Sequence, residues 1–161
     1  MSLKTKIGNI NLNSCLFNAS GVYCKIKEEL SNLNTCNSVG AILTKSCTLE
    51  SRVGNDPPIY WDDGSENSIN SSGLPNMGYK YYIENEDIVK YDKPYIVSIS
   101  GMCEEDNLKI VKETINNNDI SGIELNLSCP NIEGKSQIGY DFEAMQNLIS
   151  KVDLIISSMK S

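Results

Sequence analysis

The residues that could do chemistry stand where apolar stretches of the chain end. Lys45 follows one apolar run, and Asn126 interrupts residues 123–127, a run that is otherwise typical of a buried strand. Cys129 comes directly after that second run, and Pro130 fixes the backbone behind it. A thiol in this position either packs as a small apolar group or acts as a general base, if its pKa falls from about 8.5 towards the working pH.

Small polar residues end every apolar run that we interpret as a strand. Turns favour Gly, Ser, Asn and Pro, so any one of these ends can be purely structural. In a parallel β/α fold, however, the carboxyl ends of the strands meet at one edge and form the functional site. The four ends are 18–21 (Asn-Ala-Ser-Gly), 44–46 (Thr-Lys-Ser), 98–101 (Ser-Ile-Ser-Gly) and 126–131 (Asn-Leu-Ser-Cys-Pro-Asn).

The sequence contains no histidine, and this limits the catalytic groups that the protein can use. Ser-His-Asp triads, Cys-His pairs and zinc sites with a histidine ligand are excluded. Proton abstraction must therefore use a thiol, a lysine or a carboxylate. We expect no metal at the site.

The net charge and the distribution of apolar residues limit which partners the protein can bind and in which cell compartment it can lie. The 161 residues include 14 Lys+Arg and 21 Asp+Glu, giving a formal net charge of −7, which argues against nucleic acid and anionic membranes as partners. No apolar stretch is long enough to cross a membrane, and the first residues have no apolar core typical of a signal peptide. We expect a cytoplasmic protein whose six cysteines are reduced, each packing as a small apolar group.

The elements that must position these residues alternate between strand and helix, which predicts an α/β fold with a parallel sheet. A hairpin is predicted first, and a long loop rich in Gly, Pro, Asn, Asp and Ser separates the early elements from the later ones. The prediction comprises a hairpin over 4–12, strands over 15–19, 41–44, 95–99 and 122–127, helices over 26–33, 77–89, 104–115 and 140–159, and a loop over 51–76.

Four ordered motifs resemble dihydroorotate dehydrogenase, in its soluble fumarate-linked branch (class 1A). The most specific is Asn-Leu-Ser-Cys-Pro-Asn at 126–131, continued by Glu-Gly-Lys-Ser-Gln at 133–137 and Tyr-Asp-Phe-Glu at 140–143. Asn-Ala-Ser-Gly at 18–21, Thr-Lys-Ser at 44–46 and residues 68–76 agree in order and spacing. The resemblance extends over essentially the whole chain.

The resemblance implies an FMN-dependent oxidation of dihydroorotate to orotate in pyrimidine (UMP) biosynthesis, with fumarate as electron acceptor and a homodimer as the full-length assembly. It also implies that Cys129 is the catalytic base. The implied substrate-binding residues are Lys45, Asn70, Ser71, Ser72, Gly73, Leu74, Asn126 and Asn131, and the implied FMN-binding residues are Ser20, Lys45, Ser46 and Asn126.

The family folds as a TIM (β/α)8 barrel, and such barrels need about 250 residues. We therefore expect residues 1–161 to form a partial barrel domain, the N-terminal half with strands 1–4 and a preceding hairpin, without strands 5–8. Three interpretations stay open: a truncated product that binds FMN poorly and has little activity alone, one half of a split enzyme, or a non-catalytic half barrel that binds a ligand or oligomerises.

Overall fold

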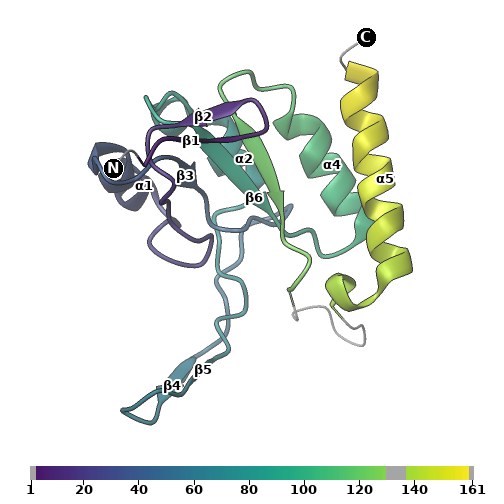
Figure 1. Cartoon of the computed structure of the whole chain (residues 1–161). Helices are drawn as coiled ribbons and strands as arrows, with labels where there is room; N and C mark the ends of the chain where they lie inside the picture. The colour runs from purple at the N-terminus through teal and green to yellow at the C-terminus, as the bar shows by residue number, and fades with distance from the viewer. Residues whose placement is uncertain (1–2, 130–136, 160–161) are drawn as a thin grey trace.

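A parallel sheet lies at the centre of the computed structural model, which describes residues 3–129 and 137–159. Within these residues the sheet has the order β3 (Ile42–Leu43), β6 (Tyr95–Ile99), β7 (Gly122–Leu125) (Figure 1). Every residue of β6 is buried, as expected for a central parallel strand that is covered on both faces. These strands confirm the predictions over 41–44, 95–99 and 122–127.

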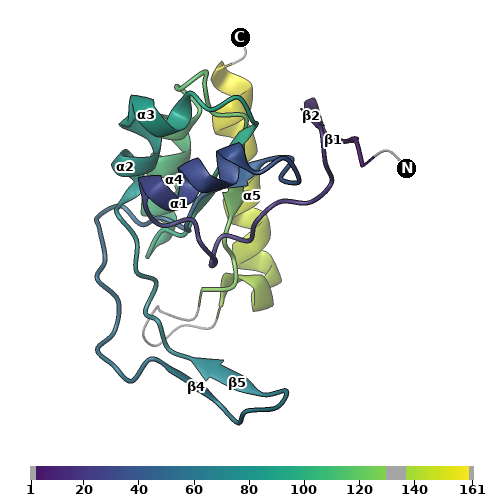
Figure 2. The same ribbon diagram turned by 90° about the vertical axis from the view of Figure 1, so that its left-hand side faces the viewer.

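The helices pack on the outer face of this sheet, where the larger core lies. Leu30, Tyr82, Ile110 and Leu148 come from four different helices and join Val97 of the central strand in that core. Figure 2 shows the helices gathered on one side of the molecule. They are α1 (Lys27–Thr35), α2 (Tyr79–Glu84), α3 (Glu86–Val89), α4 (Glu104–Thr114) and α5 (Phe142–Met159), the last preceded by the 3-10 turn η1 (Ile138–Tyr140).

The prediction of one helix over 77–89 is wrong, because two short helices occupy this stretch. Asn85 ends α2 and begins α3, and its side-chain oxygen accepts a hydrogen bond from the N–H of Asp87. Asparagine is among the best N-cap residues because its side chain satisfies an N–H that the helix leaves unpaired. The predictions of the other helices are confirmed with small shifts at their ends.

The N-terminal hairpin covers the inner face of the sheet at the amino-terminal ends of the strands. Its strands β1 (Thr5–Ile7) and β2 (Ile10–Leu12) pair antiparallel, as predicted. Leu12 forms a second, smaller core with Ala41, Leu43 and Ile96, and Ile10 packs against it. The inner face is therefore apolar at this end.

The prediction of a strand over 15–19 is wrong. This segment runs beside β3, but a side chain makes the contact that a strand's backbone would have made. Asn18 Nδ2 donates to the carbonyl of Leu43 (2.7 Å), and Asn18 Oδ1 accepts from the N–H of Leu43 (3.0 Å). One carboxamide thus satisfies both backbone groups of Leu43.

The predicted loop over 51–76 contains an antiparallel hairpin that the sequence pattern did not reveal. Its strands β4 (Tyr60–Asp62) and β5 (Ser68–Asn70) project well away from the sheet and helices in both views (Figures 1 and 2). We call residues 53–75 the arm. At its base, Arg52 and Asn76 exchange two backbone hydrogen bonds of 2.9 Å.

No helix among the described residues is long and apolar enough to cross a membrane.

Candidate functional site

A β-bulge follows β3 and determines which side chains reach the site. Leu43 pairs with Ile96, whereas Cys47 bridges Ile99, so the β3 side carries one residue more than the β6 side over this stretch. Bulges re-aim side chains, and they are common beside active sites. Lys45, inside this bulge, lines a cavity beyond the strand ends.

That cavity has a volume of about 650 Å3 and lies where the carboxyl ends of β3 and β7 meet the base of the arm. Most of the site residues predicted from the sequence lie together at this cavity. The predicted residues that line it are Lys45, Asn70, Ser71, Ser72, Gly73, Leu74, Asn126 and Cys129. Gly21 and Ser128, which belong to two of the predicted strand ends, also line it, together with Val22 and Tyr60, which were not predicted.

Asn55 holds the part of the arm that forms one wall of the cavity. Its N–H donates to the carbonyl of Ser72 (3.1 Å), and its Nδ2 donates to the carbonyl of Ser71 (2.8 Å). Gly73 has a φ of +73°, and a Cβ added there would lie 2.5 Å from Asn55 Oδ1. Only glycine satisfies both the left-handed backbone and this close approach.

Leu74 continues the same strained turn with a φ of 59°, in the left-handed region that a branched side chain rarely adopts. Its side chain is nevertheless buried. Such residues cost about 1–3 kcal/mol and persist where the surroundings impose them. The backbone of the cavity wall is therefore held in one conformation before any ligand binds.

Asn126 sits at the end of β7 with each side of its carboxamide engaged. Its Nδ2 donates to Ser46 Oγ (3.2 Å), and its Oδ1 accepts from the N–H of Ser128 (3.1 Å). Ser46 is buried and does not line the cavity, so it lies behind Asn126. Its hydroxyl is also 3.0 Å from Ser98 Oγ of β6.

Glu124 completes this polar cluster and was missed by sequence reasoning. Its Oε1 accepts a hydrogen bond from Ser98 Oγ at 2.7 Å. The signal was present, because Glu124 interrupts the same apolar run that drew attention to Asn126. Both side chains lie on the inner face, two residues apart on one strand.

Among the described residues, Ser20 and Ser46 are predicted site residues that do not line this cavity. Ser20 is half-buried and precedes Gly21, which does line the cavity. Asn131 lies outside the described residues.

The expectation that the cysteines are packed thiols is confirmed for two of them. Cys24 and Cys47 are buried, and burial raises their thiol pKa values to about 11 and about 12. The expectation is wrong for the exposed Cys15, Cys36 and Cys103, and Cys129 is half-buried at the cavity. All six lie among the described residues, and none forms a disulfide.

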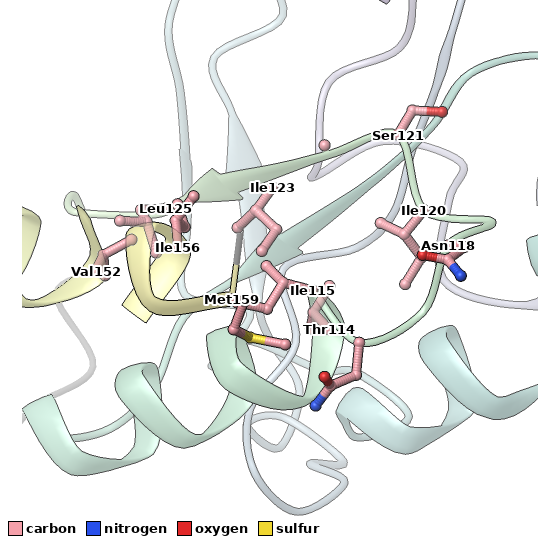
Figure 3. A pocket seen from close by; sticks show the side chains of 12 residues that line it. Thr114, Ile115, Asn118, Ile120, Ser121, Ile123, Leu125, Val152, Ile156 and Met159 are labelled. Atoms are coloured by element: carbon pink, nitrogen blue, oxygen red, sulfur yellow. The ribbon is translucent and has the colours of Figure 1, made fainter. Parts of the chain in front are cut away.

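A second cavity, of about 550 Å3, lies on the outer face between β7 and α5 (Figure 3). Ile123 and Leu125 of β7 point into it, and Val152, Ile156 and Met159 of α5 face them (Figure 3). No titratable side chain among the described residues lines it. The described residues that line this outer cavity therefore offer no group for acid–base chemistry.

The comparisons with known proteins agree with this geometry. The sequence model of the family described as "Dihydroorotate dehydrogenase" matches residues 2–158. A putative dihydroorotate dehydrogenase A (fumarate) from Streptococcus uberis is 44% identical over 156 residues, which cover 94% of this chain and 49% of that protein. A dihydroorotate dehydrogenase A (fumarate) from Lactococcus lactis subsp. lactis is 44% identical over 155 residues, covering 93% and 49%.

Among solved structures, DHODH from Eimeria tenella in complex with ferulenol superposes with a TM-score of 0.73 at 15% identity. The match covers 98% of this chain and 45% of that one, and it supports the assignment of the fold as part of a TIM barrel. The chain spans about half the length of the curated relatives it matches.

Proposed function

Because the chain belongs to the dihydroorotate dehydrogenase family, we propose that its inner cavity is the half of an active site that binds dihydroorotate and removes a proton from it. The main support for this proposal is that Lys45, Asn126, Cys129 and residues 70–74 all line one cavity. These residues come from three separate parts of the sequence. A parallel β/α fold brings them together at the end where such folds place their sites.

In the proposed reaction, Cys129 is the base. Dihydroorotate loses a proton from C5 and a hydride from C6 when it becomes orotate, so a proton acceptor must lie beside C5. The Cys129 thiolate takes that proton, and the electron pair of the broken C–H bond forms the C5=C6 double bond as the hydride departs. The half-buried position of Cys129 at the cavity supports this role, and the sequence offers no histidine to take it.

Lys45 and the wall of the cavity bind the substrate in this proposal. Among the described residues that line the cavity, Lys45 alone is cationic, so it is the partner for the substrate carboxylate. The fixed backbone of Asn70, Ser71, Ser72, Gly73 and Leu74 positions N–H groups and side chains around the ring. Asn126 and Asn131 are proposed for the amide edges of the pyrimidine, since a carboxamide both donates and accepts.

FMN is the proposed cofactor, and the chemistry that it supplies when bound is acceptance of the hydride. The described residues fit the polar edge of its ring, because Lys45 provides positive charge and Asn126 a side-chain amide at the same cavity. Ser20 and Ser46 complete the proposed FMN-binding set. Ser46 would act from behind the cavity wall, through its hydrogen bond with Asn126.

Family membership supports five further proposals. Fumarate is the proposed electron acceptor, in line with the names of the relatives, and pyrimidine synthesis is the proposed pathway. Residues 1–161 are proposed to form a partial barrel domain. A homodimer is proposed for the complete barrel, and the cytoplasm as its location.

The test pairs this chain with the half that its relatives possess. We would co-express it with the second half of the Lactococcus lactis enzyme, add FMN, and measure dihydroorotate-dependent reduction of fumarate. Activity is expected only when both halves are present. Cys129→Ala should lower it by about 100-fold or more, as loss of a general base does, while flavin absorbance is retained.

Cys36→Ala is the matched control, because Cys36 is exposed and does not line the cavity. Undiminished oxidation in Cys129→Ala would remove Cys129 from the base role. The chain alone should bind little flavin but should bind orotate in a calorimetric titration. If neither orotate binding nor restored activity is found, the proposed function is rejected.

A further inference from the structure

Glu124 faces the inside of the half barrel, where it contacts Ser98 of the neighbouring strand. It stands opposite Ser98 in the register of β6 and β7, and its Oε1 accepts the Ser98 hydroxyl at 2.7 Å. Glu124 is half-buried. The Ser98 hydroxyl is the donor in this contact and the carboxylate oxygen of Glu124 the acceptor.

This contact fixes the direction of the hydrogen bonds that follow. Ser98 has one hydroxyl proton and gives it to Glu124, so Ser46 must be the donor in the 3.0 Å contact between the two serines. Ser46 has then used its own proton and can only accept from Asn126 Nδ2, at 3.2 Å. A chain of three hydrogen bonds therefore runs from Asn126 to Glu124 in one direction.

We propose that Glu124 is a positioning residue that fixes the orientation of the Asn126 carboxamide at the inner cavity. With Glu124 as the terminal acceptor, Asn126 must turn its NH2 group towards Ser46. The N–H of Ser128 holds the opposite side of the amide by donating to Oδ1 at 3.1 Å. An Asn126 flipped by 180° would bring two acceptors together at Ser46 and two donors together at Ser128.

The fixed orientation has a consequence for the ligand, and this step rests on the proposed function. Asn126 has two N–H donors and two oxygen lone pairs, and the contacts with Ser46 and Ser128 use one of each. As far as the described residues go, one donor and one lone pair remain for the cavity. A ligand must then present an acceptor on the Ser46 side and a donor on the Ser128 side, and the amide edge of a pyrimidine has both.

The experiment uses the 161-residue chain, labelled with nitrogen-15, and needs no ligand in its first arm. Hydrogen exchange of the Asn126 side-chain NH2 is followed by NMR. In Glu124→Ala the terminal acceptor is gone, the serine hydroxyls can reverse, and exchange should accelerate by about 3- to 10-fold, the value of one hydrogen bond. Glu124→Gln keeps an acceptor oxygen and should restore slow exchange.

Ser98→Ala breaks the chain while leaving Glu124 in place, so it serves as the second variant if Glu124→Ala does not fold. It should accelerate the same exchange. Glu143→Ala, at an exposed position in the first turn of α5, is the control for loss of a carboxylate and should change nothing. Unchanged Asn126 exchange in Glu124→Ala, or no restoration in Glu124→Gln, would overturn the proposal.

The second arm measures the affinity for orotate in the same variants. Glu124→Ala should bind orotate about 3- to 10-fold more weakly, and Glu124→Gln should bind it like the parent chain. If orotate binds to none of them and co-expression restores no activity, while Asn126 exchange responds as expected, the positioning role of Glu124 stands and the proposed function fails. Equal orotate affinity in all of them would overturn the effect of Glu124 on recognition.

Discussion

At the scale of single residues, the site depends on one positive charge. Lys45 reaches the cavity because of the bulge after β3, and it is the only cationic side chain among the described residues that line the cavity. The molecule as a whole carries a net charge of −7. An anionic substrate is therefore attracted to this place by a local group and against the overall charge.

Lys45→Met tests that dependence, because it keeps the length of the side chain and removes the charge. Orotate affinity should fall by roughly 10- to 100-fold, since hydrogen bonds to charged groups contribute about 1.5–3 kcal/mol. Calorimetric titration of the chain with orotate measures the change. Lys109→Met, at an exposed position on α4, is the control and should bind orotate like the parent chain. Equal affinity in both variants would show that Lys45 does not bind the carboxylate.

At the scale of elements, the arm forms one wall of the cavity, and its hairpin was not predicted from the sequence pattern. Tyr60 of β4 and Asn70 of β5 face each other across the arm, and both line the cavity. The stretch from Asn70 to Leu74 then bends back as the cavity wall, with Asn55 behind it. The arm thus supplies one wall of the cavity beside the strand ends.

Gly73→Ala should disrupt this wall more than Gly64→Ala, a change at the turn of the arm. Gly73 and Gly64 have nearly equal φ values, +73° and +74°, so alanine carries the same left-handed cost of about 1–2 kcal/mol at each. Only at Gly73 would the new Cβ also meet Asn55, at 2.5 Å; at Gly64 nothing lies within 4 Å. We expect Gly73→Ala to lower the free energy of unfolding by about 1–3 kcal/mol more than Gly64→Ala.

Urea unfolding of the two variants measures this difference, and NMR shifts of residues 70–74 report the wall directly. Equal unfolding free energies, with unchanged shifts in Gly73→Ala, would show that the close approach of Gly73 to Asn55 does not constrain the wall.

The elements that the sequence predicted well are those in which one apolar pattern dominates. The run Tyr95–Ile99 is buried throughout, and α4 and α5 carry apolar residues at helical spacing, so burial alone defines them. The segment 15–19 has the same apolar character, but the carboxamide of Asn18 replaces its pairing with β3. The arm was missed because its short strands are exposed and its composition is that of turns.

For the site, the sequence identified the side chains at strand ends but not the ones that hold them. Lys45, Asn126 and Cys129 were found because each interrupts or ends an apolar run. Asn55 and Glu124 act through contacts with residues distant in the sequence, at Ser71 and Ser98, and no local spacing reveals such pairs.

At the scale of the whole molecule, stability should fall at alkaline pH, because the outer core buries ionisable groups in their neutral form. Burial raises the thiol pKa values of Cys24 and Cys47 to about 11 and about 12, and burial is also the main cause that raises Tyr79 to about 12. In the unfolded chain these groups ionise at their usual, lower pKa values. Between the two values the unfolded state binds fewer protons than the folded state, so the free energy of unfolding decreases as pH rises.

The stabilisation from each buried thiol should be fully present below about pH 9 and lost as pH rises through the folded-state pKa. We expect a loss of roughly 2 kcal/mol per thiol between pH 8 and pH 10.5. Urea unfolding at a series of pH values measures it. Cys24→Ala and Cys47→Ala should each flatten the dependence, whereas the exposed Cys36→Ala should leave it as steep as in the parent chain. An identical pH dependence of the unfolding free energy in all variants would show that the buried thiols of Cys24 and Cys47 do not cause it.

The closed base of the arm separates sequence changes within the arm from sequence changes in the sheet. Arg52 and Asn76 exchange backbone hydrogen bonds there, and the buried Asn76 side chain also binds Thr48 and Gly78. The sheet therefore meets the same anchor whatever lies between these two residues. Insertions, deletions and substitutions at the exposed turn between β4 and β5 can change the far end of the arm while this anchor, the sheet and its helices stay unchanged, so that turn is a natural place to redesign the arm independently of folding.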